Sequence, residues 1–153
     1  MDIILDLIRN PFLLTALSSW FVAQVIKTVI YDIINKKLVF ERLVGDGGMP
    51  SGHSATVSSL ATLALLTYGA DSFEFALAGI LAIIVCHDAM GVRRETGKQA
   101  VIINDLIKSF EIFASEELPE TKLKEFVGHS PIQVAAGICI GILNAVCLNW
   151  LLF

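Results

Sequence analysis

The sequence predicts an all-α membrane protein with about four transmembrane helices and an amphipathic helix between the third and the fourth. Hydrophobic residues make up 55% of the 153 residues and charged residues only 17%, against about a quarter in a typical soluble domain. Four apolar stretches leave too little polar sequence to cover a soluble core, and the one long polar region has helical periodicity. The length predicts a single domain, residues 1–153.

The four apolar stretches approach the roughly 20 residues that a bilayer-crossing helix needs. They run over residues 11–34, 53–69, 72–90 and 131–153. The second is short for a full crossing and rich in Ala, Ser and Thr, as helix-packing surfaces in membranes tend to be. The fourth has no charged residue, and Gly137 and Gly141 lie four residues apart, a spacing that permits close helix contact.

The polar region between the third and fourth stretches covers residues 91–129. Within it, residues 99–114 place apolar side chains at helical spacing and polar ones between them. This pattern predicts an amphipathic helix at the membrane interface or against protein. The acidic residues that follow predict a solvated loop; they are Glu116, Glu117 and Glu120.

The basic residues predict the orientation. They gather between the first and second stretches and between the third and fourth, whereas the segment between the second and third has only Asp71 and Glu74. The positive-inside rule then places both termini outside and the polar loops on the cytoplasmic side of a cell membrane. The net charge of −4 argues against a nucleic-acid partner, which would favour a basic surface.

Chemically capable residues gather at that cytoplasmic edge. Residues 47–54 form a glycine-rich turn that runs into the second helix, and backbone N–H groups at a helix start make an anion cradle. His53 could exchange a proton with a bound group there. Arg93 and Arg94 suit bidentate phosphate contacts, and Lys27 needs an anionic partner or a water-filled cavity because its helix is otherwise apolar.

Each of these features has a simpler interpretation. The glycine turn could be only a loop and helix cap, and the paired arginines could anchor a helix at lipid head groups. Lys27 could extend to the interface. His129 could be a cap beside Pro131, and Asp88 could neutralise an arginine. Their joint position on one side of the membrane favours the functional interpretation.

The same residues resemble a known family. Residues 50–53, Pro-Ser-Gly-His, match the central motif of the type-2 phosphatidic acid phosphatase superfamily, which also includes vanadium haloperoxidases. Residues 129–137 resemble its last motif, in which a nucleophilic histidine leads into the final helix. The ordered set 47–55, 88–94 and 97–100 is similar to the small, divergent bacterial and plant branch.

This resemblance implies a phosphatase that needs no metal or other cofactor. His129 would attack phosphorus and form a phosphohistidine, and His53 would protonate the leaving oxygen and later activate water. The groups that would hold the equatorial oxygens are Lys27, Arg93 or Arg94, the Ser51 hydroxyl and the Gly52 N–H. An alternative is a metal site, for which four residues could supply ligands: His53, His87, Asp88 and His129.

The sequence departs from the superfamily pattern at four positions. Ile34 and Asn35 stand where the first motif has an arginine and a proline, which leaves Arg42 as the loose candidate for that arginine. Leu123 stands where the last motif has an arginine before its histidine. Gln133 takes the place of the acid that would orient the nucleophilic histidine, and Asp88 could substitute for it if the fold brings it near.

Two function classes follow. The first is a membrane phosphatase that acts on a lipid phosphate or pyrophosphate. The second is a non-catalytic relative that uses the same cradle to bind anionic lipid head groups or to assist a partner membrane protein. The expected partners are therefore the lipid bilayer and a phosphorylated lipid, and the sequence does not define an oligomeric state.

Overall fold

The computed structural model describes residues 3–36, 47–114, 123 and 127–152, and within them the regular secondary structure is entirely helical. The helices in this part of the chain are α1 (Ile3–Ile8), α2 (Pro11–Asn35), α3 (Gly52–Tyr68), α4 (Phe73–Met90), α5 (Val92–Ala114) and α6 (Pro131–Leu152). The predicted all-α architecture is therefore confirmed.

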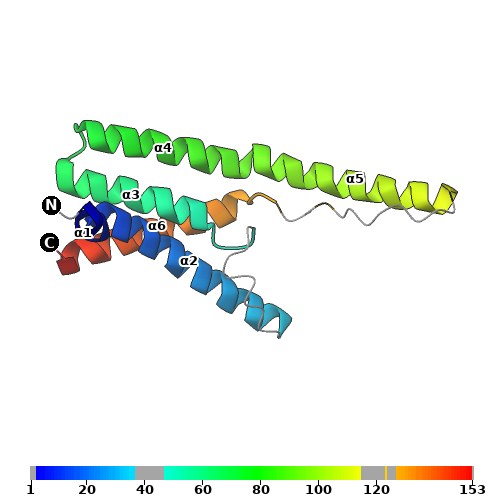
Figure 1. The fold of residues 1–153 in the computed structure, drawn as a ribbon, viewed down its shortest axis with the longest axis horizontal. Helices are drawn as coiled ribbons and strands as arrows, with labels where there is room; N and C mark the ends of the chain where they lie inside the picture. The colour runs from blue at the N-terminus through cyan, green and yellow to red at the C-terminus, as the bar shows by residue number, and fades with distance from the viewer. Residues whose placement is uncertain (1–2, 37–46, 115–122, 124–126, 153) are drawn as a thin grey trace.

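Helix α3 lies at the centre of the bundle, where it packs against α2, α4 and α6 (Figure 1). Helices α4 and α5 follow one another almost along one line, with Gly91 between them, and α5 runs beyond the end of α3 (Figure 1). The two chain termini lie at the end of the bundle opposite the first turn of α3 (Figure 1).

Among the described residues, three helical segments are long and apolar enough to cross a membrane: Pro11–Asn35, Phe73–Phe110 and Pro131–Leu151. Helix α3 has 17 residues, which is about 26 Å at 1.5 Å per residue, and it falls short of the roughly 30 Å hydrocarbon core of a bilayer. This agrees with the prediction that the second apolar stretch is short. The chain is an all-α membrane protein in which α3 is packed among the longer apolar helices α2, α4 and α6.

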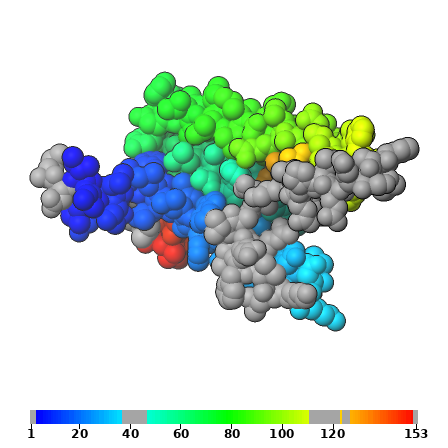
Figure 2. Space-filling view, turned by 45° about the vertical axis from the view of Figure 1, so that its right-hand side comes forward, coloured from blue at the N-terminus to red at the C-terminus, as the bar shows by residue number. Residues whose placement is uncertain are grey.

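The outer face of α4 is apolar and uncovered. Leu77, Ile80, Ile83 and Ile84 each leave more than half of their surface exposed, and α4 and the start of α5 form a continuous outer face in Figure 2. An apolar face of this kind is unfavourable in water, whereas lipid chains are as apolar as leucine itself. The face is therefore suited to contact with the bilayer.

Helices α3 and α6 make backbone contact at two glycines of α6. A Cβ at Gly137 would overlap the backbone oxygen of Ser51. One at Gly141 would overlap the Ser58 hydroxyl and the backbone oxygen of Ala55. The close contact that the glycine spacing predicts is thus confirmed, and it brings the first turn of α3 beside the first turns of α6.

Helix α2 is joined to α6 by Asn144. Its Nδ2 donates hydrogen bonds to Ser18 Oγ (2.9 Å) and to Ser19 Oγ (2.7 Å). Hydrogen bonds of this kind between helices stabilise membrane bundles, because lipid offers the polar groups no alternative partner. The contact fixes α2 about two turns before Lys27.

Helix α5 is amphipathic, as predicted, but it begins earlier than residue 99. Its first residue is Val92, so Arg93 and Arg94 lie on its first turn. Helical hydrogen bonding resumes at once after α4: the Gly91 N–H donates to the His87 carbonyl (2.9 Å), and the Glu95 N–H donates to the Gly91 carbonyl (3.0 Å).

The chain returning from α5 is fixed to that helix by Asn104. The Asn104 amide donates to the Leu123 carbonyl (3.0 Å) and accepts from the Leu123 N–H (3.1 Å). The side chain is only 4% exposed, so a polar group inside the contact holds Leu123 beside α5. The predicted acidic loop, which includes Glu116, lies outside the described residues.

Candidate active site

The glycine-rich turn before α3 forms one wall of the candidate site. Gly47 and Gly48 have φ angles of +81° and +83°, in the region that glycine enters without strain. A Cβ at Gly48 would lie 3.5 Å from Cγ of Lys27. The turn therefore packs directly on the stem of Lys27, a side chain of α2 that is only 5% exposed.

Ser51 is the N-cap of α3. Its Oγ accepts hydrogen bonds from the Ser54 N–H (3.3 Å) and from the Ser54 hydroxyl (3.0 Å), and both serines are fully buried. The Ser51 N–H donates to the Gln133 carbonyl of α6 (3.0 Å). Ser51 thus fixes the first turn of α3, which carries Gly52 and His53, and its hydroxyl lies inside the protein.

His129 is held by backbone contacts where α4, α5 and α6 meet. Its N–H donates to the Ala89 carbonyl at the end of α4 (3.0 Å). The preceding residue, Gly128, has φ +86° and lies against the start of α5, where a Cβ would overlap the backbone of Arg94. These contacts leave His129 only 4% exposed.

Helix α6 begins with a capping box made by Ser130 and Gln133. Gln133 Oε1 accepts from the Ser130 N–H (2.9 Å), and Ser130 Oγ accepts from the Gln133 N–H (3.4 Å). The resemblance to the phosphatase superfamily implies that Gln133 stands in the place of an acid that would orient His129. In the structure the carbonyl oxygen of this amide accepts the capping hydrogen bond from the Ser130 N–H at the N-terminus of α6.

The imidazole rings of His53 and His129 lie close together. Their centroids are 6.4 Å apart and their planes are inclined by 58°. His53 is exposed on the first turn of α3, whereas His129 is buried. A group of the size of phosphate could therefore contact a buried imidazole on one side and a solvent-exposed imidazole on the other.

The structure separates the two neighbouring arginines. Arg93 Nε donates to Asp88 Oδ2 (2.8 Å), and both side chains of this pair are nearly half exposed. Arg94 instead lines a cavity together with His129. Asp88 therefore neutralises Arg93, as its simpler interpretation proposes, and Arg94 is the arginine beside the buried histidine.

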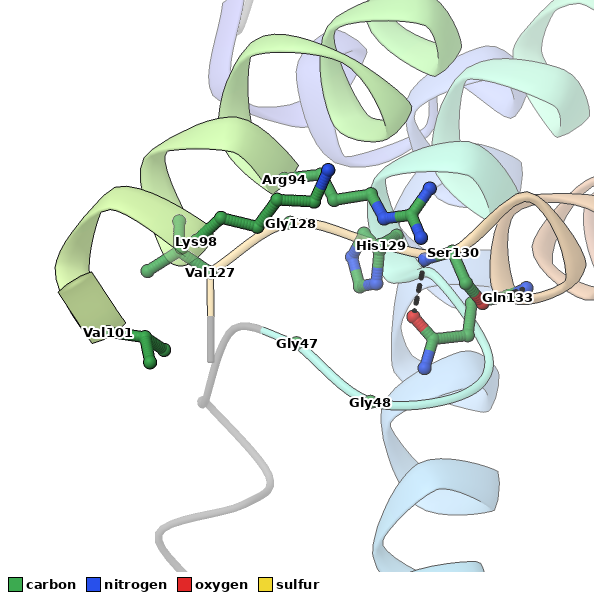
Figure 3. Close-up of a pocket in the computed structure, with 11 residues that line it drawn as sticks. Gly47, Gly48, Arg94, Lys98, Val101, Val127, Gly128, His129, Ser130 and Gln133 are labelled. Carbon is green, nitrogen blue, oxygen red and sulfur yellow. Dashed lines mark hydrogen bonds between the residues drawn. The ribbon is translucent and has the colours of Figure 1, made fainter. Parts of the chain in front are cut away.

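A cavity of about 310 Å³ lies in front of His129 (Figure 3). The residues that line it are Gly47, Gly48, Arg94, Gly97, Lys98, Val101, Val127, Gly128, His129, Ser130 and Gln133. The volume is at the lower end of the range for ligand sites. In Figure 3 the side chains of Arg94 and Lys98 both extend from α5 toward the histidine.

Several of the lining residues, including Lys98, are not among the predicted site residues. Gly97 and Lys98 belong to the segment 97–100 that carries part of the family resemblance, and they fall just before the predicted amphipathic helix, which begins at residue 99. The spacing of these residues could have predicted the position of Lys98. Lys98 follows Arg94 by four residues, so one helix that includes both places them on the same face. Arg42 lies outside the described residues.

No metal centre is apparent in the part of the chain that the structure describes. Nowhere in residues 3–36, 47–114, 123 and 127–152 do three or more His, Cys, Asp or Glu side chains form a group that could hold a metal ion. Of the four candidate ligands, Asp88 pairs with Arg93, and His53 and His129 face each other.

The sequence has relatives among known proteins. Residues 8–144 match the family described as "Divergent PAP2 family". The chain is similar to the uncharacterized membrane protein YuiD of Bacillus subtilis (strain 168), with 42% identity over 155 aligned residues that cover 95% of this chain and 98% of the relative. No solved structure gives a significant match.

Proposed function

Because this chain belongs to the divergent PAP2 family, we propose that it is an integral-membrane phosphatase that hydrolyses a lipid phosphate or diphosphate through a phosphohistidine intermediate. The observation that carries the proposal is the pair of His53 and His129, with ring centroids 6.4 Å apart, beside a cavity lined by Arg94. A nucleophile, a proton shuttle and concentrated positive charge are sufficient parts for phosphoryl transfer. Residues 1–153 would act as one membrane-embedded unit.

The proposed reaction has two steps. In the first, a nitrogen of His129 attacks phosphorus, the bond from phosphorus to the ester oxygen breaks, and His53 gives its proton to that oxygen. In the second, His53 takes a proton from a water molecule, whose oxygen attacks phosphorus. The phosphorus–nitrogen bond then breaks, inorganic phosphate leaves, and both histidines return to their starting state.

The burial of the two histidines fits these roles. His53 is exposed, so its proton can exchange with solvent between turnovers. His129 is 4% exposed, and a buried nucleophile meets few water molecules that would compete for the substrate site. The hydrogen bond from its N–H to Ala89, and the close contact of the preceding Gly128 with Arg94, help to fix its position.

Positive charge and N–H donors would stabilise the transferred group. Arg94 is the arginine on the cavity, and Lys27 contacts the cradle from α2 through Gly48. The Gly52 N–H lies at the positive end of the α3 dipole. In this proposal Ser51 acts indirectly, because its hydroxyl caps the helix that presents those N–H groups.

The distribution of basic residues supports a site at the cytoplasmic face of the cell membrane. The site lies at the first turn of α3, and both chain termini lie at the other end of the bundle (Figure 1). In the proposed orientation the termini are therefore outside, and the substrate is a lipid whose phosphate faces the cytoplasm.

A non-catalytic relative that binds anionic lipid head groups is the second candidate function. The observation that favours it is Gln133, which stands where an acid would be expected and whose carbonyl oxygen takes part in the capping box. Such a protein would keep the cradle and the cations but would release no phosphate.

Phosphate release from purified protein distinguishes the two functions. We expect His129→Ala and His53→Ala to lower kcat/KM on a hydrolysed lipid phosphate by at least about 10³-fold and 10²-fold. His87→Ala, which removes an exposed histidine at the end of α4, is the matched control and should keep wild-type activity. Full activity in the His129 variant would overturn the phosphatase proposal. Orthovanadate that protects an inactive wild-type protein from thermal unfolding would favour the binding function.

A further inference from the structure

A second cation lies on the cavity, one helical turn from Arg94. Lys98 follows Arg94 by four residues on α5, and both side chains line the same cavity as His129 (Figure 3). Gly97, between them in the sequence, is buried and adds no side chain to the wall. The wall that α5 gives to the site therefore carries two positive charges at successive turns.

Lys98 is held by a contact that a substrate can replace. Its Nζ lies 2.6 Å from Glu95 Oε1, and more than half of each side chain is exposed. Exposed ion pairs of this kind are weak because water and salt screen them. A diphosphate in the cavity carries more negative charge than one carboxylate, and Arg94 lies nearby, so the diphosphate would compete well with Glu95 for the ammonium group.

The other groups of the proposed site already serve one phosphoryl group. In the proposed function, Lys27, Arg94 and the N–H groups at the start of α3 hold the phosphoryl group that His129 attacks. Arg94 lines the cavity together with His129, and Lys27 contacts Gly48 in the cavity wall. In a lipid monophosphate the next atoms are an ester oxygen and a hydrocarbon chain, which give an ammonium group no anion to bind. In a diphosphate the next group is a second phosphoryl group.

We propose that Lys98 binds the phosphoryl group adjacent to the scissile one, so that this site prefers lipid diphosphates to lipid monophosphates. The inference rests on the proposed function. Attack by His129 on the terminal phosphorus breaks its bond to the bridging oxygen, which leaves with the bonding electrons as part of a lipid monophosphate. Lys98 balances the negative charge that appears on this leaving group. Val101 and Val127 add apolar side chains to the lining of the same cavity.

The test compares one alcohol in two substrates, dodecyl monophosphate and dodecyl diphosphate. We expect Lys98→Gln to lower the ratio of kcat/KM for diphosphate over monophosphate by about 10- to 100-fold, the effect of losing one charge-assisted contact. Lys98→Arg keeps the charge and should restore most of the ratio. Lys108→Gln removes an exposed lysine of the same helix outside the cavity and should leave the ratio unchanged. A wild-type ratio in Lys98→Gln would overturn the inference.

A binding measurement separates this inference from the proposed function. Inorganic pyrophosphate and inorganic phosphate are titrated into His129→Ala protein, with and without Lys98→Gln. We expect tighter binding of pyrophosphate, and loss of that preference when Lys98 is replaced. If neither lipid is hydrolysed by wild-type protein but the preference depends on Lys98, the phosphatase proposal fails and the second anion site stands. If hydrolysis occurs and neither ratio depends on Lys98, the phosphatase stands and the inference fails.

Discussion

Gly128 lies so close to the start of α5 that a Cβ on it would overlap the backbone nitrogen of Arg94. The residue also has φ +86°, where a side chain is strained. The contact matters for the site because Gly128 precedes the buried histidine and Arg94 carries the cavity's guanidinium group. Because Gly128 has no side chain, the start of α5 can approach it closely enough for His129 and Arg94 to line the same cavity.

Gly128→Ala tests this contact. We expect a loss of at least about 1–2 kcal/mol in stability from the left-handed backbone alone, together with lower kcat/KM, because the start of α5 must move away. The measurements are thermal unfolding in detergent and phosphate release. Gly79→Ala is the control: it adds a Cβ in α4 with no atom within 4 Å and should leave stability unchanged or slightly higher. Equal behaviour of the two variants would contradict the account of Gly128.

The neighbouring arginines should differ sharply in their effect on activity. Arg94→Gln is expected to lower kcat/KM by about 10²-fold or more, because one donor aimed at developing charge contributes about this much. Arg93→Gln removes only an exposed contact to Asp88 and should stay within about threefold of wild type. Steady-state kinetics on one lipid phosphate decide the matter. A larger loss in the Arg93 variant would show that the arginine roles are exchanged.

Gln133 offers a test of the capping box at the start of α6. Gln133→Ala should lower stability by about 1 kcal/mol, because the Ser130 N–H loses its acceptor. Gln133→Glu should keep wild-type stability, since a carboxylate accepts the same bond and lies near the positive end of the helix dipole. Thermal unfolding of the three proteins measures this. An alanine variant as stable as wild type would show that the Gln133 side chain does not stabilise the start of α6.

The predicted orientation can be tested by cysteine labelling in intact cells. Cys86, Cys139 and Cys147 are first replaced by alanine, and then Lys108→Cys or Asp71→Cys is introduced at an exposed position. A membrane-impermeant maleimide should label position 71 in intact cells and position 108 only after permeabilisation. The reverse pattern would place the site at the outer surface.

The sequence predicts a structural feature correctly where a local pattern of residues is compatible with a single structure. Long apolar stretches predicted the membrane helices, and the spacing of Gly137 and Gly141 predicted a close contact that the structure confirms. The juxtaposition of His53 and His129 was expected only through the resemblance to a family, because nothing local relates two residues so far apart in the chain.

The sequence could not distinguish residues whose difference is purely spatial. Arg93 and Arg94 are identical side chains, and only the rotation of α5 decides which one lines the cavity. Lys98 was missed because the predicted helix began at residue 99, although Gly91 does not prevent helical bonding from resuming at Val92. Gln133 carried a readable signal, since Ser-x-x-Gln before an apolar run is a capping box.

The most direct test of the central claim is to look for the phosphohistidine. Wild-type protein is mixed with a lipid phosphate labelled in its terminal phosphoryl group, quenched in base, and examined by peptide mass spectrometry. We expect a label that is stable in base, labile in acid and attached to His129. It should be absent from His129→Ala and should persist longer in His53→Ala, where water activation is slow. Phosphate release by wild-type protein at full rate with no label on His129 would contradict the account.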